Sequence, residues 1–326
     1  MNRIVSAALT GLVAAVSLAL PSIPHAQSFT GKTLRIIVPF APGGTSDILA
    51  RALSNKVGES LGATVVVDNK PGANGVLGSD LVAKSAPDGL TLLLTDVGGL
   101  TSAAPLGMKL PFDAGKDLAP VTMIAYSPHI AVVNPGVPAK TLSELVAASK
   151  TKAGGFSAAT SGAGSAPHLA AALFAHRAGV NWVFVPYKGG AQAITDMIAG
   201  HAQVMFNGML ATLPPVKSGQ LRVLAVSSEQ RWPTLPDVPT VAESGFPGFV
   251  TGSWQGLMVA AATPKPIIDK LNAEFAKALA IPEVRERLVA QGAEPRPMSS
   301  SAFADFLKAE TVKWTQLVKD TGIKAE

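Results

Sequence analysis

The segment "VPFAPGGTSDILAR", residues 38–51, places two adjacent glycines among small hydrogen-bonding side chains. Gly43 and Gly44 carry no side chain that would keep a ligand away from their backbone N–H groups. Thr45 and Ser46 are residue types that cap the start of a helix. Free N–H groups and the positive end of a helix dipole favour an anion. The segment therefore predicts an anion-binding turn.

Similar turns recur in the second half of the chain. The segments "ATSGAGSAPHLA" (residues 159–170) and "PYKGGAQAI" (186–194) again combine glycines with small polar side chains, and "MFNG" (205–208) ends an apolar run with an amide. One such turn is common in any α/β protein. Several of them, divided between two parts of the chain, favour one cleft that closes on an oxygen-rich ligand.

Short apolar runs that suit buried parallel strands alternate with helical patterns, which predicts an α/β fold with sheets flanked by helices. The strand-like runs form two series, at residues 34–39, 64–67 and 90–95, and then at 156–159, 182–186, 202–206 and 221–226. Two series indicate two sheets. The connections between them are expected at a strand-like pair around residues 121–133 and at residues 249–260.

These connections divide the chain into two lobes. Lobe 1 is predicted at residues 29–128 plus 255–326, and lobe 2 at residues 129–254, inserted into lobe 1. Within lobe 2, Thr141 and Glu144 form a capping-box pattern that opens a helix.

The first 26 residues have the charge and apolar pattern of a signal peptide, with cleavage after residue 26 or residue 28. No other segment approaches eighteen consecutive apolar residues. The chain has 326 residues and a formal net charge of +5, without a run of basic residues that would indicate a nucleic-acid partner. It has no Cys, and four of its five His follow the signal. We therefore expect an exported, soluble protein with no metal or cofactor.

Six motifs, including "VPFAPGGTSDILAR", "SGAGSAPHLAAALF" and "VPYKGGAQAITDMIAG", stand in the order seen in tripartite tricarboxylate transporter substrate-binding proteins of the Bordetella uptake gene type. The chain resembles this family over essentially its whole mature length. The resemblance implies a periplasmic type II binding protein that holds a small carboxylate between two hinged lobes and serves membrane components of a transporter. It implies ligand contacts at Phe40, Ala41, Gly43, Gly44, Thr45, Ser46, Asp47, Ser161, Gly164, Ser165, His168, Gly190, Ala191 and Asn207.

Several of these residues also have purely structural interpretations. Asp47 suits the first turn of a helix as well as a ligand site, and His168 can pack on a neighbour instead of contacting the ligand. Arg51 is expected in a salt bridge or at the surface, and Lys188 in solvent. Asn207 replaces an Asp found in many relatives, which removes a negative charge near the ligand.

Two other functions use the same cleft. Asp47 and His168 could act as the acid–base pair of a hydrolase or isomerase, and a periplasmic sensor would bind its ligand in the same way. Among carboxylate ligands, the glycine-rich turns suit a dicarboxylate, an aromatic acid or an acidic amino acid.

Overall fold

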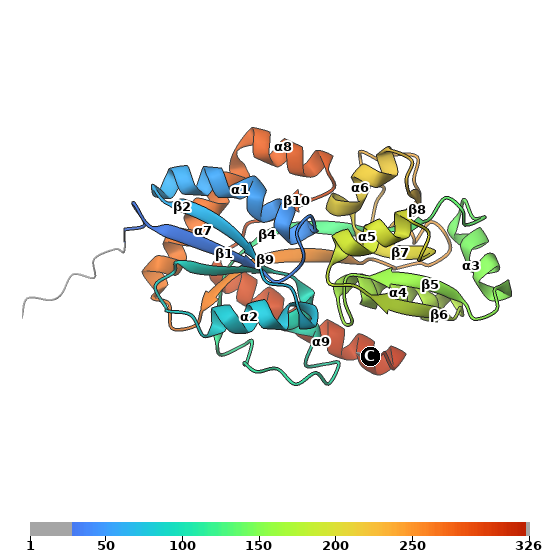
Figure 1. Ribbon diagram of the computed structural model, residues 1–326, viewed down its shortest axis with the longest axis horizontal. Coiled ribbons are helices and arrows are strands. Elements are labelled where there is room, and N and C mark those ends of the chain that lie inside the picture. Colours follow the sequence, from blue (N-terminus) through green and yellow to red (C-terminus); the bar gives the residue numbers. More distant parts are fainter. Residues whose placement is uncertain (1–27, 324–326) are drawn as a thin grey trace, which may run out of the picture.

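The computed structural model describes residues 28–323, so the predicted signal peptide lies outside the described residues. The molecule is elongated, with one lobe at each end and long strands between them (Figure 1). Its strands are β1 (Thr33–Val38), β2 (Thr64–Asn69), β3 (Thr91–Thr95), β4 (Leu118–Val133), β5 (Phe156–Thr160), β6 (Trp182–Pro186), β7 (Val204–Gly208), β8 (Arg222–Val226), β9 (Gly252–Ala260) and β10 (Glu294–Pro295).

The helices connect successive strands and cover both faces of the sheets (Figure 1). They are α1 (Thr45–Leu61), α2 (Val76–Ala83), α3 (Leu142–Thr151), α4 (Ala166–Ala178), α5 (Gly190–Ile198), α6 (Met209–Lys217), α7 (Lys265–Ala280), α8 (Pro282–Ala290) and α9 (Ser300–Thr321), with a 3-10 turn η1 (Ala73–Gly75) and a π-helical turn η2 (Gly98–Ser102).

The two lobes repeat one strand order. In lobe 1 the order is β2-β1-β3-β9-β4, and in lobe 2 it is β6-β5-β7-β4-β8. In each lobe the first three strands are parallel and the fourth is antiparallel to them. The carboxyl ends of the parallel strands, where open α/β sheets bind ligands, carry the glycine-rich turns.

Strand β4 belongs to both sheets. It pairs with β9 up to Pro128, opposite Gly252, and with β7 from His129, opposite Gly208. The sequence predicted a pair of strands in this region, but the structure has one continuous strand of 16 residues. Sixteen residues at about 3.3 Å each span roughly 50 Å, enough to run through both lobes.

Each sheet has an apolar core on both faces. In lobe 1, α1 and α7 cover one face and α2 and α9 the other. In lobe 2, α3 and α4 lie on one face and α5 and α6 on the other. A strand that is buried on both sides reads as a continuous apolar run, which is why the sequence placed most strands correctly.

Local signals set the helix ends. The Thr141 hydroxyl accepts a hydrogen bond from the N–H of Glu144, as the capping-box pattern predicted, and α3 begins at the next residue, Leu142. Helix α1 ends at Gly62, whose left-handed conformation (φ 63°) closes its last turn. The two-residue strand β10 and the turn η2 were not predicted, because neither has a periodic pattern.

Candidate functional site in the cleft between the lobes

The glycine-rich turns of both lobes meet at a cavity with two compartments. The inner compartment has a volume of about 30 Å³ and the outer one about 200 Å³. Phe40 and Ser161 line both compartments, so the two are adjacent. Seven of the residues that the sequence placed at the site line the inner compartment: Phe40, Gly44, Thr45, Ser46, Ser161, Gly190 and Asn207.

The start of helix α1 presents unpaired backbone donors to this compartment. Gly44 is the N-cap and has no side chain, so no side-chain oxygen caps the helix. None of the hydrogen bonds among residues 28–323 uses the N–H of Gly44, Thr45 or Ser46. The prediction that Thr45 or Ser46 caps the helix is wrong, because both already lie within it. Their N–H groups are free to bind an anion.

Asp47 stabilises the turn that precedes α1. Its carboxylate accepts hydrogen bonds from the Gly43 N–H at 2.9 Å and from Arg51 Nε at 3.0 and 3.1 Å. Burial alone would raise the pKa of Asp47, but the hydrogen bonds from Arg51 and Gly43 outweigh it and lower the pKa. The prediction of a free Gly43 N–H is therefore wrong. Arg51 forms the predicted salt bridge, at 3.0 Å.

The start of helix α4 in lobe 2 is closed by side chains. The Ser165 hydroxyl accepts from the N–H of His168, and His168 Nδ1 accepts from the N–H of Gly164 at 2.9 Å. Burial lowers the pKa of His168 to about 4, so its ring is neutral at pH 7. The ring also packs edge-on against Phe184. Gly164, Ser165 and His168 thus shape the turn and do not line either compartment.

Asp47 and His168 therefore each serve the turn of their own lobe, with no hydrogen bond between them. Neither side chain lines the inner or the outer compartment.

The remaining predicted residues hold the lobes together. Ala41 donates its N–H to the carbonyl of Lys188 across the cleft at 3.3 Å. Ala191 lies against Gly43, since a Cβ on Gly43 would be 3.4 Å from the Ala191 Cβ. Ser102 adds a second bond between the lobes, to the Gly164 carbonyl at 2.7 Å. The structure therefore has the lobes in contact around the cavity.

The Asn207 side chain is positioned by its own lobe. Its Nδ2 donates to the Thr212 hydroxyl at 2.9 Å. That bond sets the orientation of the amide, and the Asn207 side-chain oxygen has no partner among the described hydrogen bonds.

Six polar residues of the cavity were not predicted as ligand contacts. Asp96, Ser253 and Gln255 line the inner compartment, and Asn74, Tyr187 and Lys188 line the outer one. The pKa of Asp96 is raised to about 6 by burial, offset in part by the Gly98 N–H. Asp96 had a usable signal, since it directly follows the third strand at the same sheet edge as Gly43. Gln255 lies inside β9, where nothing in the local sequence marks it.

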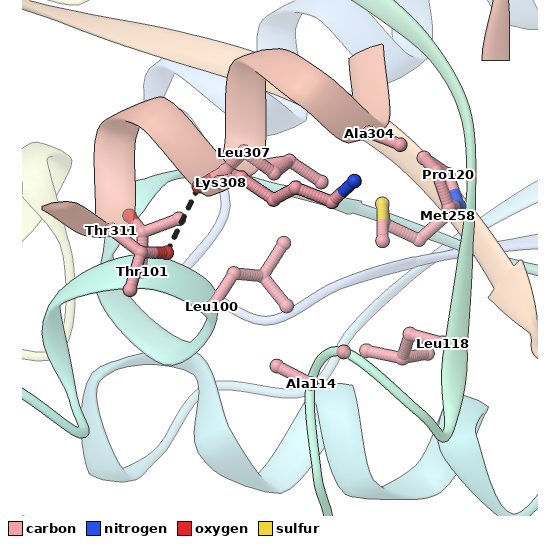
Figure 2. Close-up of a pocket in the computed structure, with 11 residues that line it drawn as sticks. Leu100, Thr101, Ala114, Leu118, Pro120, Met258, Ala304, Leu307, Lys308 and Thr311 are labelled. Atoms are coloured by element: carbon pink, nitrogen blue, oxygen red, sulfur yellow. Dashed lines mark hydrogen bonds between the residues drawn. The ribbon is translucent and has the colours of Figure 1, made fainter. Parts of the chain in front are cut away.

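A second pocket lies in lobe 1, away from the glycine-rich turns. Figure 2 shows side chains from η2 and α9, among them Leu100, Leu307 and Lys308, around a mostly apolar space. The Thr311 hydroxyl is bonded within α9, to the carbonyl of Leu307 at 2.9 Å. None of the residues predicted for the site lines this pocket.

Metal and membrane features are absent from residues 28–323. These residues contain no group of three or more His, Asp and Glu side chains that could hold a metal ion. No helix in this part of the chain is long and apolar enough to cross a membrane.

A model of the tripartite tricarboxylate transporter family receptor, TctC, matches residues 49–323. The chain belongs to this family. Protein BugT of Bordetella pertussis (strain Tohama I) is 37% identical over 331 residues, which cover 99% of each chain. The resemblance drawn from the six motifs is thereby confirmed.

Two solved structures of TctC-type proteins match both lobes. Rpa4515 of R. palustris with adipate is 31% identical, with a TM-score of 0.87 over 90% of this chain and 98% of that one. MatC (Rpa3494) from Rhodopseudomonas palustris with bound malate is 32% identical, with a TM-score of 0.84 over 89% and 100%. The predicted fold, two α/β lobes joined by crossing strands, is confirmed.

Proposed function

We propose that this TctC protein captures a small carboxylate in the cavity between its lobes and delivers it for uptake. The observation that carries the proposal is the start of α1, where the N–H groups of Gly44, Thr45 and Ser46 have no partner and these residues line the inner compartment. The adipate and malate bound by the two structural neighbours support the same ligand class.

The donors around the inner compartment are sufficient to hold a carboxylate without a cation, although Lys188 lines the outer compartment. Among the described residues, no Lys or Arg lines the inner compartment. Hydrogen bonds to a charged group contribute about 1.5–3 kcal/mol each. Backbone N–H groups at α1 from lobe 1, with Ser161 and the start of α5 from lobe 2, provide several such bonds. The ligand thus bridges the lobes.

Ligand binding would then stabilise the closed form. Each lobe alone offers only part of the shell that replaces the water lost from a carboxylate. Moving a closed fraction from 1:99 to 99:1 requires a preference of about 5.5 kcal/mol for the closed state, which a few charge-assisted bonds can supply. We place the lobe boundaries at residues 29–128 plus 255–326 and 129–254. The change of β4 partners between Pro128 and His129 supports the first boundary.

The site of action would be the periplasm, after removal of the signal peptide. Membrane components of a tripartite transporter would recognise the closed surface and receive the ligand unchanged. The Asp47 and His168 contacts, which occupy both side chains within their own lobes, support release without catalysis.

Two measurements test the proposal. Native mass spectrometry of protein purified without added ligand should show a bound acid, and NMR should recover that acid chemically unchanged. Small-angle scattering should show a smaller radius of gyration once a binding acid saturates ligand-free protein. An open ligand-free form whose radius does not change at saturation would refute the closing mechanism.

A further inference from the structure

Two side chains of the inner compartment are buried with unused hydrogen-bonding capacity. Gln255 is fully buried, and neither its Nε2 nor its Oε1 has a partner among the described residues. Asp96 is 9% exposed, and its carboxylate accepts one hydrogen bond, from the Gly98 N–H at 3.1 Å. Buried polar groups are usually satisfied, so these two side chains indicate a ligand that satisfies them.

The sheet places these two side chains at the same edge. Strand β3 pairs with β9 so that Thr95 lies opposite Gly256. The next residue after Thr95 is Asp96, and the residue before Gly256 is Gln255, so both lie where the pairing of β3 with β9 ends. The start of α1 faces the same compartment from its other side, since Gly44 and Asp96 both line it.

The inner compartment is too small for two separate ends of a ligand. Its volume of about 30 Å³ corresponds to about two water molecules. One small head group must therefore reach both the N–H donors of α1 and the acceptors on Asp96 and Gln255. The rest of the ligand extends into the outer compartment, beside Pro39, Phe40 and Tyr187.

We propose that Asp96 and Gln255 select acids that carry a hydrogen-bond donor, a hydroxyl or an ammonium group, on the carbon next to the carboxylate. The carboxylate binds the N–H groups of α1, and the neighbouring donor binds the Asp96 carboxylate, with Gln255 beside it. This inference rests on the proposed function and adds a specificity to it. Without that donor, the ligand carboxylate would lie near the Asp96 carboxylate with no group between them to bind Asp96, which is unfavourable.

The inference predicts a preference within matched sets of acids. Calorimetry would compare succinate with malate and aspartate, and then the corresponding sets built on propionate, adipate and 3-phenylpropionate. In the set that fits the outer compartment, the 2-hydroxy or 2-amino acid should bind at least ten-fold more tightly than the unsubstituted acid. A site built to hydrogen-bond a donor discriminates strongly against an analogue that lacks it.

Substitution of Asp96 tests whether Asp96 and Gln255 cause the preference for 2-hydroxy or 2-amino acids. Asp96→Asn should reduce the ratio between the affinities of the substituted and the unsubstituted acid to below three-fold. The unsubstituted acid should keep or gain affinity, because the substitution removes a negative charge near its carboxylate. Gln255→Leu should reduce the ratio to a smaller extent. The matched control is Asp113→Asn, because Asp113 is exposed and pairs with Lys116 outside the cleft; it should leave every affinity unchanged.

The outcomes separate this inference from the proposed function. If wild-type protein binds none of the acids, the proposed function fails. If it binds an unsubstituted acid as tightly as the substituted ones, the proposed function stands and the subsite is refuted. If the Asp96→Asn protein keeps the preference for the substituted acid, the role of Asp96 is refuted.

Discussion

Helices α1 and α4 start in similar glycine-rich turns, one in each lobe, yet the α1 start leaves more backbone N–H groups without a partner. At α1 the N-cap is Gly44, which has no side chain to accept a hydrogen bond. At α4 the N-cap is Ser165, whose hydroxyl accepts from His168, and the His168 ring accepts from Gly164. The side chain at the N-cap thus decides which of the first N–H groups of a helix are used within its own lobe and which stay free.

Packing explains why α4 is closed. Ala166 and Leu169, in the first turn of α4, are fully buried in a core that includes Trp254 and Phe303. Helix α4 contacts β9 and α9, so its start lies against elements of lobe 1. An unpaired N–H buried there would cost about 1–3 kcal/mol. Pro167 of α4 lines the inner compartment too, but the residues with unpaired N–H groups that line it are Gly44, Thr45 and Ser46 of the α1 start.

The largest effect is expected from a side chain placed at Gly44, where helix α1 begins with unpaired N–H groups. Gly44→Val should reduce ligand affinity at least 100-fold, because the side chain would stand between an anion and the N–H groups. The fold should tolerate the change, since Gly44 has φ −77° and a Cβ there meets only the Ala41 carbonyl, at 3.6 Å. Calorimetry gives the affinity and urea unfolding gives the stability.

A glycine outside the cleft provides the control for Gly44→Val. Gly115 likewise has room for a Cβ, whose nearest neighbour would be Asp113 Oδ1 at 3.5 Å. Gly115→Val should bind ligand like the wild type. Normal binding by Gly44→Val would show that the α1 start is not the anion site.

The next largest effect is expected at His168, whose ring accepts a hydrogen bond from the Gly164 N–H at the start of α4. His168→Leu should lower the free energy of unfolding by about 2 kcal/mol, because it leaves the buried N–H of Gly164 unpaired. The exposed His176 lies on the same helix, so His176→Leu is the matched control and should change stability little. Equal stability of the His168→Leu and wild-type proteins would show that the α4 start does not need this acceptor.

The pH dependence gives an independent check on His168. The pKa of His168 in the folded protein is lowered to about 4, whereas an unfolded His has a pKa near 6.5. Between these values the unfolded chain binds more protons, so the stability contributed by neutral His168 is complete above pH 6.5 and is lost as pH falls toward 4. The difference between wild type and His168→Leu should shrink over that range.

The fold was more predictable from the sequence than the site was. Buried parallel strands are apolar runs, and the six motifs indicated two lobes with glycine-rich turns at one cleft. The sequence could not show that Gly44 is the N-cap, which depends on a one-residue difference in where the helix starts. Nor could it show that Gln255 meets Asp96, because their proximity arises from the pairing of β3 with β9, about 160 residues apart.

A smaller effect is expected at Asp47, which stabilises the open turn without contacting the cavity. Asp47→Asn should lower the free energy of unfolding by about 1–2 kcal/mol at pH 7, since a charge-assisted bond to Gly43 becomes a neutral one and the exposed Arg51 adds little. The exposed pair of Asp305 with Lys308 provides the control, because Asp305→Asn should change stability by less than about 0.5 kcal/mol.

The pKa of Asp47 also sets the pH range of this effect. Because that pKa is lowered in the folded protein, the stabilisation by the carboxylate is present above the unfolded pKa of about 3.9 and is lost as pH falls through the folded value. Urea unfolding at pH 7 and pH 3 should therefore show a smaller difference between wild type and Asp47→Asn at the lower pH. An equal difference at both would show that the charge of Asp47 does not matter.

The smallest effect is expected from exchanging the two N-caps. In Gly44→Ser the new hydroxyl can accept the N–H of Asp47, as Ser165 accepts that of His168 at the equivalent position of α4. Stability should rise by a few tenths of a kcal/mol. Affinity should fall about five-fold, since the serine side chain would partly block the approach of a ligand to the N–H groups of Gly44, Thr45 and Ser46, and a typical hydrogen bond contributes about 0.5–1.5 kcal/mol. Ser165→Gly should lower stability by a few tenths of a kcal/mol and change ligand affinity less than two-fold. Equal losses of affinity in the two variants would show that both helix starts take part in binding.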